Sequence, residues 1–388
     1  MKSTPYDHAA LDSRVRDAAR AYGFDAVGVA RADVPLDTDF ERYRSFVEAG
    51  MHGEMRYLAD NSQVRQRLDT EDILEGARSV ICVARRYARG KDDEARDAPT
   101  AQAIARYARG RDYHNGLRKK LRQLAAFVRR LGTQEAPVRA RPLVDDAPVL
   151  ERAWAARAGL GFVGKNGLLI VPGQGSFILL GEVITTLALT PDVPVEGRCG
   201  ACTRCLDVCP TQAFARPFVL DARRCVAYLT IEQRGAIPPD LRDGVGGHLF
   251  GCDDCQTVCP FNAVKVATDA SAFAPHARWA DTRIEDMLDP STESWAELSE
   301  GSPIHRATAD GLARNAAIVL GNRRDRSARP ALERAAESHP SPVVREAAAW
   351  GLAQVKTESA SESESGSESE SESESESMRV RNMLRHQV

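Results

Sequence analysis

Eight of the nine cysteines of this 388-residue chain lie between Cys199 and Cys259, and this clustering constrains the fold more than any other feature. The stretch opens with the spacing Cys-x2-Cys-x2-Cys-x3-Cys-Pro, which ends at Pro210. It closes with Cys-x2-Cys-x3-Cys-Pro, which ends at Pro260, and Cys225 lies between the two runs. Tight loops of this kind bring several thiolates to one metal centre, so the segment is expected to fold around metal rather than around disulfides.

The first run has the spacing with which a bacterial ferredoxin binds one [4Fe–4S] cluster and sends its fourth cysteine to a second cluster. The second run lacks its first member, because Leu249 stands three residues before Cys252. Cys225 is the remaining cysteine and is assigned to that role. The pattern therefore predicts two crossed clusters, one bound by Cys199, Cys202, Cys205 and Cys259 and the other by Cys209, Cys225, Cys252 and Cys255.

Two zinc sites are the alternative, since they would also need eight sulfurs and Cys-x2-Cys pairs are common zinc ligands. The repeated spacing with crossed ligands favours iron–sulfur clusters over zinc. The ninth cysteine, Cys82, lies in the apolar run from Ser79 to Ala84 and is expected to be a small buried hydrophobic residue.

The composition, 43% hydrophobic and 28% charged, is typical of a soluble globular protein, and the length predicts two or three domains. No apolar run approaches the roughly 20 residues that span a bilayer. The N-terminus shows neither an apolar signal core nor a twin-arginine pair, so a cytoplasmic location is expected for oxygen-sensitive clusters. The net charge of −3 includes eight glutamates among residues 358–376, and it does not by itself indicate nucleic-acid binding.

Hydrophobic periodicity predicts an α/β (α+β) first domain over residues 1–190. A charged loop is expected at 90–100. The pair Asp145-Asp146 follows a strand and precedes a helix that begins near Pro148. The other expected helices cover 11–22, 40–58 with a break near Gly50–Gly53, and 113–131, and the expected strands cover 24–30, 79–84, 138–144, 168–171 and 176–184.

Three further segments follow the first domain. Residues 191–270 form the expected ferredoxin-like two-cluster domain. Residues 271–356 are expected to be all α-helical, with two units at 311–321 and 342–353 that resemble a HEAT-type hairpin. Residues 357–388 begin with alternating Ser and Glu, a composition that cannot bury a core, and are predicted to be disordered.

Several motifs resemble one family, the epoxyqueuosine reductases, in the order in which that family has them. The resemblance covers about residues 8–355 and includes the C-terminal helical segment. The motif Val-Asp-x-Ala-Pro-Val-Leu-Glu is far more specific than the cysteine pattern, which many redox proteins share. The motifs are Arg106–His114, Val144–Glu151, Gly159–Asn166, Gly175–Glu182, Asp221–Glu232 and Gly251–Gln256.

The resemblance implies that the first domain binds cobalamin, cycling through cob(II)alamin and cob(I)alamin, and that the protein reduces epoxyqueuosine to queuosine at the wobble position of tRNA. The epoxide oxygen would leave as water after a two-electron, two-proton reduction. A reduced corrinoid supplies electrons that no side chain can supply, and two clusters can pass them on one at a time. An external ferredoxin- or flavodoxin-type donor, a monomeric state and no membrane partner are expected.

The resemblance also assigns site residues. It implies that Asp145 is the proton donor, which requires burial to raise its pKa. The alternative role for this pair is helix capping, which is assigned to Asp146. Stretches that line the corrinoid in the family correspond here to Arg67, Tyr107, Asp145, Lys165, Asn166 and Ser176, together with Asp253 and Asp254 from the cluster loop.

For RNA, the resemblance places the wobble base near the segment that contains Tyr228, Thr230 and Glu232. Tyr228 would stack on the base or, alternatively, pack in the core beside Cys225. Arginines that would bind phosphates are Arg223, Arg224, Arg306, Arg314 and Arg323.

Two other functions remain open at this point. A reductive dehalogenase shares the plan of a corrinoid with two clusters, but such proteins carry a twin-arginine signal and lack the helical tail seen here. A ferredoxin-type electron-transfer protein would use residues 1–190 only for docking.

Overall fold

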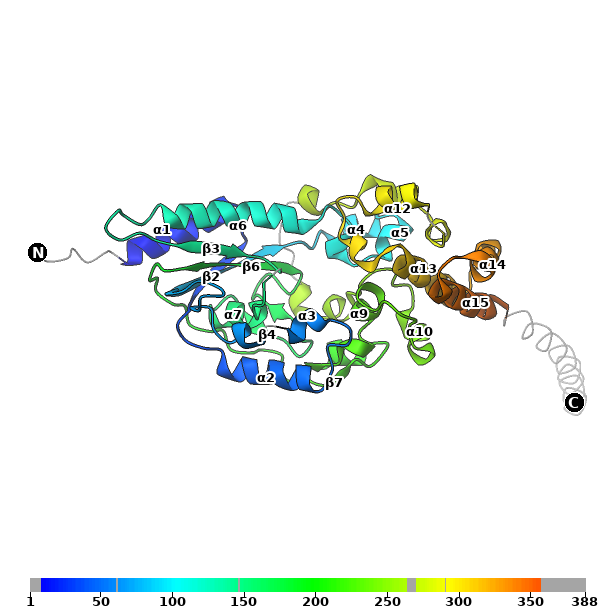
Figure 1. Cartoon of the computed structure of the whole chain (residues 1–388), viewed down its shortest axis with the longest axis horizontal. Coiled ribbons are helices and arrows are strands. Elements are labelled where there is room, and N and C mark those ends of the chain that lie inside the picture. Colours follow the sequence, from blue (N-terminus) through cyan, green and yellow to red (C-terminus); the bar gives the residue numbers. More distant parts are fainter. Residues whose placement is uncertain (1–7, 61, 146, 264–269, 290, 357–388) are drawn as a thin grey trace, which may run out of the picture.

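The computed structural model describes residues 8–60, 62–145, 147–263, 270–289 and 291–356. The molecule is elongated, with a sheet and its helices at one end and a helical segment at the other (Figure 1). The cysteine-rich segment lies between them. The predicted tail at 357–388 lies outside the described residues.

A four-stranded antiparallel sheet organises the first domain, as the apolar periodicity predicts. The strand order is β1 (Ala26–Arg31), β2 (Ser79–Arg86), β6 (Ile178–Thr185) and β3 (Ala140–Leu143). Alternate residues face opposite sides of a strand, so the sheet has two apolar faces. On one face Ile81 and Val183 pack with α1 (His8–Ala21) and α6 (Tyr113–Arg129). On the other, Val80 and Ile184 pack with α7 (Glu151–Arg157).

The remaining elements of the first domain are shorter. These elements are α2 (Asp37–Glu48), α3 (Arg56–Ala59), η1 (Ser62–Arg65), α4 (Lys91–Ala95), α5 (Pro99–Gln102), η2 (Arg106–Ala108), β4 (Phe162–Val163) and β5 (Leu169–Ile170). Helices α2 and α3, with a break between them, confirm the expected broken helix over 40–58. Cys82 is fully buried in the sheet, as predicted.

Two expectations for this domain are wrong. Residues 90–100 are not simply a loop, because α4 and α5 form there, the latter with Pro99 in its first turn. Helix α7 begins at Glu151 with Leu150 as its N-cap and no side-chain cap, so the helix does not start at Pro148. Asp146, the residue assigned to capping, lies outside the described residues.

The cysteine-rich segment contains short elements between its loops. Helices α8 and α11, each following the first cysteines of one run, pack against each other. The elements are α8 (Arg204–Asp207), β7 (Phe214–Arg216), β8 (Val219–Leu220), η3 (Ala222–Arg224), α9 (Val226–Ile231), α10 (Pro239–Val245), α11 (Asp254–Thr257) and η4 (Pro260–Asn262).

The C-terminal segment is all helical, as predicted, but its last part has three helices rather than two units. Helix α14 was missed, and α15 packs against both α13 and α14. Gly321 and Gly351 allow the close approach of α13 and α15, because a Cβ on Gly321 would lie 2.7 Å from the Gly351 Cα. The elements are η5 (Ala270–Phe273), η6 (Ala277–Ala280), η7 (Glu285–Met287), α12 (Thr292–Ser299), η8 (Pro303–Ala307), α13 (Ala309–Arg323), η9 (Arg326–Ala328), α14 (Arg329–Ser338) and α15 (Pro342–Lys356).

One continuous apolar core joins the cysteine-rich segment to the C-terminal helices. Leu229 and Phe250 from the former pack in the same cluster as Ile304 and Leu312 from the latter. This core fixes α9 and the loop after it relative to α13. Among the described helices, none is both long enough and apolar enough to cross a membrane.

Candidate active site

Asp145 lies in a turn just beyond the end of β3. Its φ of 48° lies in the left-handed region, which side chains other than glycine rarely adopt. The backbone N–H of Asp145 donates to Glu151 Oε1 at 2.8 Å, which ties the turn to the first residue of α7. The carboxylate is half exposed (55%), so it faces the site rather than the core.

Two donors from the start of α6 meet the Asp145 carboxylate. The Tyr113 hydroxyl donates to Oδ2 at 2.8 Å, and His114 Nε2 lies 3.2 Å from the same oxygen. The other ring nitrogen of His114, Nδ1, lies 2.7 Å from Asp112 Oδ1, and Asp112 also caps α6. Both contacts use the same carboxylate oxygen, Oδ2.

The expectation that burial raises the pKa of Asp145 is wrong for this structure. Burial alone would raise it, but the hydrogen bonds from His114 and Tyr113 and the positive charge of His114 together lower the pKa below its ordinary value. The hydrogen bond to Asp145 outweighs burial and, with the bond to Asp112, raises the pKa of His114. The proton of this group is therefore held on His114, with Asp145 as its carboxylate partner.

Sequence reasoning missed Tyr113 and His114, although they end the Arg106–His114 motif. Burial and then the Asp145 charge raise the pKa of Tyr113, so its phenol stays a donor. The missing signal was three-dimensional, since the start of α6 and the end of β3 are 31 residues apart in sequence at His114 and Asp145. Neither residue type nor spacing indicates that they meet.

A second wall of the site joins Tyr57, Arg306 and Glu232. The Arg306 guanidinium lies 5.5 Å from the centre of the Tyr57 ring, and its Nε donates to Glu232 Oε1. Tyr57 is a large aromatic side chain with 49% of its surface exposed. The Arg306 charge also helps to lower the pKa of Asp145, so this wall and the proton-holding group act within one electrostatic environment.

Tyr107 connects these groups to the cysteine-rich segment. Its ring meets the Tyr113 ring edge-on at 6.0 Å and lies 6.3 Å from Phe250. Burial, then the Asp253 and Asp145 charges, raise the pKa of Tyr107. Tyr107 therefore lies between Tyr113 and Phe250, and its contact with a corrinoid stays a prediction.

Two of the three residues expected near RNA in the 228–232 segment are buried. Tyr228 packs in the core, and its hydroxyl accepts the Glu54 N–H at 2.8 Å, so the core interpretation holds rather than stacking. Gly53, with a φ of +59°, makes room for it, because a Cβ there would lie 2.4 Å from the Tyr228 oxygen. The fully buried Thr230 accepts from the Gly251 N–H at 2.9 Å, so its side chain cannot contact RNA. Glu232 alone reaches the site.

Arg314 is a structural residue, and its assignment to phosphate binding is wrong. It is 1% exposed and donates to the carbonyl oxygens of Leu229, Gln233 and Gly235 at 2.6–2.7 Å. Burial lowers its pKa to about 10. It therefore fixes the segment that carries Glu232 against α13.

The other arginines expected at RNA lie away from these contacts. Arg223 pairs with Asp221 through two hydrogen bonds at 2.9 and 2.7 Å, and Arg224 Nε donates to Thr211 O. Arg323 is exposed at the end of α13. Among the described residues, no hydrogen bond or ion pair joins these three arginines to the Asp145 site.

Some of the residues predicted to line a corrinoid lie in the first domain, and others lie in the cysteine-rich segment. Ser176 Oγ donates to Gln256 Oε1 at 3.0 Å, and Gln256 Nε2 donates to Asp253 Oδ1 at 3.1 Å. Asp253 in turn accepts the Arg106 N–H at 2.8 Å, next to Tyr107. This chain of contacts links the segment just before β6, the cluster loop and η2.

Lys165 and Asn166 lie at the first cysteine loop. Lys165 Nζ donates to the carbonyl oxygens of Gly200 and Cys202, at 2.6 and 3.0 Å. Asn166 is buried, and its Nδ2 has no hydrogen-bond partner among the described residues. An orphaned buried amide donor fits a bound group with polar substituents, such as a corrinoid. Arg67 differs, because it is exposed and paired with Asp69 at 2.8 Å.

The eight clustered cysteines are free thiols that lie close to one another. Burial, then the sulfurs of Cys199, Cys259 and Cys202, raise the pKa of Cys205. Burial, then Cys225, Asp253, Cys205 and Cys209, raise the pKa of Cys255 to about 12. Mutual repulsion between sulfurs is what a bound iron cluster would relieve.

Backbone N–H groups also point at these sulfurs. The Ala213 N–H donates to Cys209 Sγ at 3.3 Å. Burial raises the pKa of Cys225, and hydrogen bonds from the Tyr228 and Ala227 N–H groups lower it. Such donors favour the thiolate form, and hydrogen bonds to sulfur are usual around iron–sulfur clusters. The donor set therefore fits two four-cysteine clusters.

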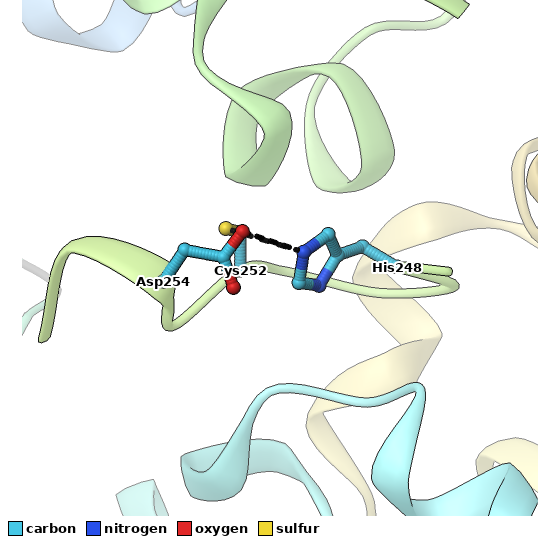
Figure 2. A group of neighbouring side chains, drawn as sticks. All are labelled: His248, Cys252 and Asp254. Carbon is cyan, nitrogen blue, oxygen red and sulfur yellow. Dashed lines mark hydrogen bonds and ion pairs between the residues drawn. The ribbon is translucent and has the colours of Figure 1, made fainter. Parts of the chain in front are cut away.

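Beside Cys252 lies a group that the sequence did not indicate. His248 Nε2 is 3.0 Å from Asp254 Oδ2 and 3.7 Å from Cys252 Sγ (Figure 2). Asp254, predicted to contact the corrinoid, is thus engaged by His248. Burial and then the Asp254 charge raise the pKa of the Cys252 thiol.

Three segments match known protein families. Residues 198–262 match the 4Fe-4S double cluster binding domain, residues 67–146 match the epoxyqueuosine reductase family, and residues 304–363 match HEAT repeats. The first match supports clusters over zinc, and the third confirms the HEAT-like character of the C-terminal helices.

Curated relatives extend over nearly the whole chain. An epoxyqueuosine reductase of Pseudomonas aeruginosa is 40% identical over 90% of this chain and 96% of its own length. One of Escherichia coli is 36% identical over 91% of both chains.

Solved structures agree with these relatives. An epoxyqueuosine reductase bound to a tRNA-Tyr epoxyqueuosine-modified stem loop has a TM-score of 0.80 and 32% identity, covering 90% of this chain and 91% of that one. The enzyme of Bacillus subtilis, with its catalytic Asp loop swung out of the active site, has a TM-score of 0.79 and 31% identity over the same shares.

Proposed function

The chain belongs to the epoxyqueuosine reductase family, and from this premise we propose that it reduces epoxyqueuosine to queuosine at the wobble position of tRNA. In this reaction both bonds of the epoxide oxygen to carbon break, the oxygen leaves as water, and a carbon–carbon double bond remains. The change consumes two electrons and two protons. Family membership over nine-tenths of the chain, rather than one segment, disfavours both the dehalogenase and the simple electron carrier.

The cofactors implied are two [4Fe–4S] clusters and cobalamin, which when bound supply the two electrons that no side chain can supply. Their protein ligands are proposed to be the two crossed sets of four cysteines named above. For the corrinoid, the residues with supporting contacts are Tyr107, Asn166, Ser176 and Asp253. Lys165 holds the loop of Cys202 in place, and Arg67 has only the family correspondence in its favour.

Asp145 passes a proton to the departing oxygen, and His114 supplies that proton to Asp145. The hydrogen bond between Asp145 and His114 favours a proton on His114, because the pKa of His114 is raised and that of Asp145 is lowered. Tyr113 donates to the same carboxylate oxygen and so stabilises the carboxylate once the proton has left. The Asp145 side chain is half exposed, so a substrate oxygen can approach the carboxyl group.

The RNA base is proposed to bind against Tyr57, Arg306 and Glu232. An enzyme that acts on a wobble base must take it out of its stack, and an exposed aromatic ring then supports it. Tyr57 is exposed, and the Arg306 guanidinium lies over its ring, whereas Tyr228 is buried. Glu232 presents a carboxylate that accepts hydrogen bonds, which matches the N–H donors on the pairing edge of a guanine-type base.

The surrounding assignments follow from this function. A tRNA-modifying enzyme with oxygen-sensitive clusters is proposed to work in the cytoplasm as a monomer. Its electrons are proposed to come from a low-potential ferredoxin- or flavodoxin-type donor. The helices after residue 271 are proposed to support the RNA-binding wall, since Arg306 comes from η8.

Replacement of Asp145 by Ala tests the proposal. The holoprotein should contain about eight iron atoms and one cobalt per chain, as two [4Fe–4S] clusters and one corrinoid require. Asp145→Ala should keep both contents and lose turnover of an epoxyqueuosine-containing anticodon stem-loop. Turnover at the parent rate would refute the role of Asp145, and an absence of corrinoid after reconstitution would refute the cofactor assignment.

A further inference from the structure

His248 lies beside a cluster ligand without being one of the cysteines. The residue is part of the loop between α10 and α11, and about a quarter (26%) of its side chain is exposed. Its Nε2 faces two acceptors, Asp254 Oδ2 at 3.0 Å and Cys252 Sγ at 3.7 Å (Figure 2). The three ligand-type atoms all lie within 4.8 Å of one another.

The partners of His248 decide which ring nitrogen carries hydrogen. An ionised carboxylate accepts hydrogen bonds and donates none, so Nε2 must be the protonated nitrogen. The single N–H is directed mainly at Asp254 and secondarily at the sulfur, because the distance to Oδ2 is the shorter. Asp254 therefore fixes the orientation of the ring that faces Cys252.

We propose that His248 is a positioning residue for the cluster bound by Cys252, setting its reduction potential by directing an N–H at the ligand sulfur and holding the Asp254 carboxylate. The inference depends on the cluster assignment proposed above, and it goes beyond that assignment by giving the two clusters unequal surroundings.

Two electrostatic effects act in the same direction. Hydrogen bonds to cluster sulfurs stabilise the reduced, more negative cluster and so raise its reduction potential. A bare carboxylate within 4.8 Å of the sulfur would oppose the added electron, and the His248 N–H offsets that charge. Loss of the imidazole therefore makes this cluster harder to reduce.

The other cluster has a different neighbour. Its loop is held by Lys165, whose ammonium group donates to the carbonyl oxygens of Gly200 and Cys202. Replacement of His248 should leave that environment unchanged. The two clusters should then respond differently to one substitution, which a general loss of folding would not produce.

The test is a potentiometric titration of the anaerobic holoprotein followed by EPR. His248→Leu fills the space without a donor, His248→Gln keeps an N–H near the position of Nε2, and Asp243→Asn alters an exposed charge on α10 as a control. One reduction step should move to a more negative potential in His248→Leu. Both steps should stay near the parent values in His248→Gln and Asp243→Asn.

Several results would overturn the proposal. These are parent potentials in an iron-replete His248→Leu protein, equal shifts of both steps, or a shift in His248→Gln as large as in His248→Leu. If His248→Leu loses iron, the parent protein labelled with ¹⁵N-histidine decides, since its reduced cluster should show a ¹⁵N coupling in ENDOR spectra. No such coupling refutes the contact. A holoprotein without any [4Fe–4S] signal would instead refute the cluster assignment beneath it.

Discussion

Replacement of His114 by Gln separates the two things that this histidine does for Asp145. Gln keeps an N–H near the position of Nε2, so the hydrogen bond at Asp145 Oδ2 can persist, but an amide cannot carry the proton. The remaining proton site would be Asp145 itself. In the parent protein the hydrogen bonds from His114 and Tyr113 and the charge of His114 lower the pKa of Asp145 despite its burial, so this carboxyl is a poor store for the proton.

The size of the effect follows from these protonation states. In the parent protein the pair holds its proton below the raised pKa of His114, whose ordinary value is 6.5, so the rate should be flat to at least that pH and fall above it. In His114→Gln the protonated fraction of Asp145 falls tenfold per pH unit throughout this range. Loss of the stored proton should therefore cost roughly the 10²–10⁴-fold that a general acid contributes.

The assay measures initial rates on an epoxyqueuosine-containing stem-loop from pH 5 to 8, with excess chemical reductant. Cluster and corrinoid contents are checked in each protein. Asn115→Ala changes an exposed residue on the same turn of α6 and should keep the parent profile. If His114→Gln shows the parent profile and rate, the stored proton is not on His114 and the reasoning fails.

Two further predictions concern stability. Arg314→Met removes the buried guanidinium that bonds three carbonyl oxygens and should lower the free energy of unfolding by about 3–5 kcal/mol, while the exposed Arg323→Met on the same helix should change it by less than about 0.5 kcal/mol. Equal denaturation midpoints for the two variants would contradict this. Glu182 is fully buried with neither carboxyl oxygen partnered among the described residues, and burial, then the Glu151 and Asp145 charges, raise its pKa well above 4.5. Because a raised pKa gives stability that is lost as pH rises, the parent should lose up to about 1.4 kcal/mol per pH unit above 4.5 relative to Glu182→Gln, until the folded-state pKa is reached. Parallel stability profiles in denaturant unfolding from pH 5 to 8 would refute that assignment.

The parts of the fold that the sequence predicts are those with a strong local signal. The apolar runs of β2 and β6 and the amphipathic spacing of α6 indicate buried strands and a long helix, and all three form. Helices α4 and α5 were missed because they are short and α4 is charged, so their formation depends on packing rather than on periodicity. The pairing of β5 with β4 was missed because register across a turn is a tertiary property.

The candidate site was only partly predictable for the same reason. The cysteine spacing predicts its ligands without a structure, because short loops limit which sulfurs can meet. The partners of Asp145 come from α6, so the direction of its pKa shift depends on tertiary contact and was expected with the wrong sign. Tyr57 and Tyr228 are alike as residues, but Tyr228 packs in the core and against Gly53 while Tyr57 is half exposed, a difference that tertiary packing decides.

The most direct test of the central claim is the identity of the product nucleoside. The anaerobic holoprotein, with both clusters and its corrinoid verified, is incubated with reductant and a stem-loop that carries epoxyqueuosine, and the nucleosides are then separated and analysed by mass spectrometry. The account predicts conversion to queuosine, with loss of one oxygen atom, and no conversion by Asp145→Ala. Unchanged epoxyqueuosine after incubation with the fully loaded protein would contradict it.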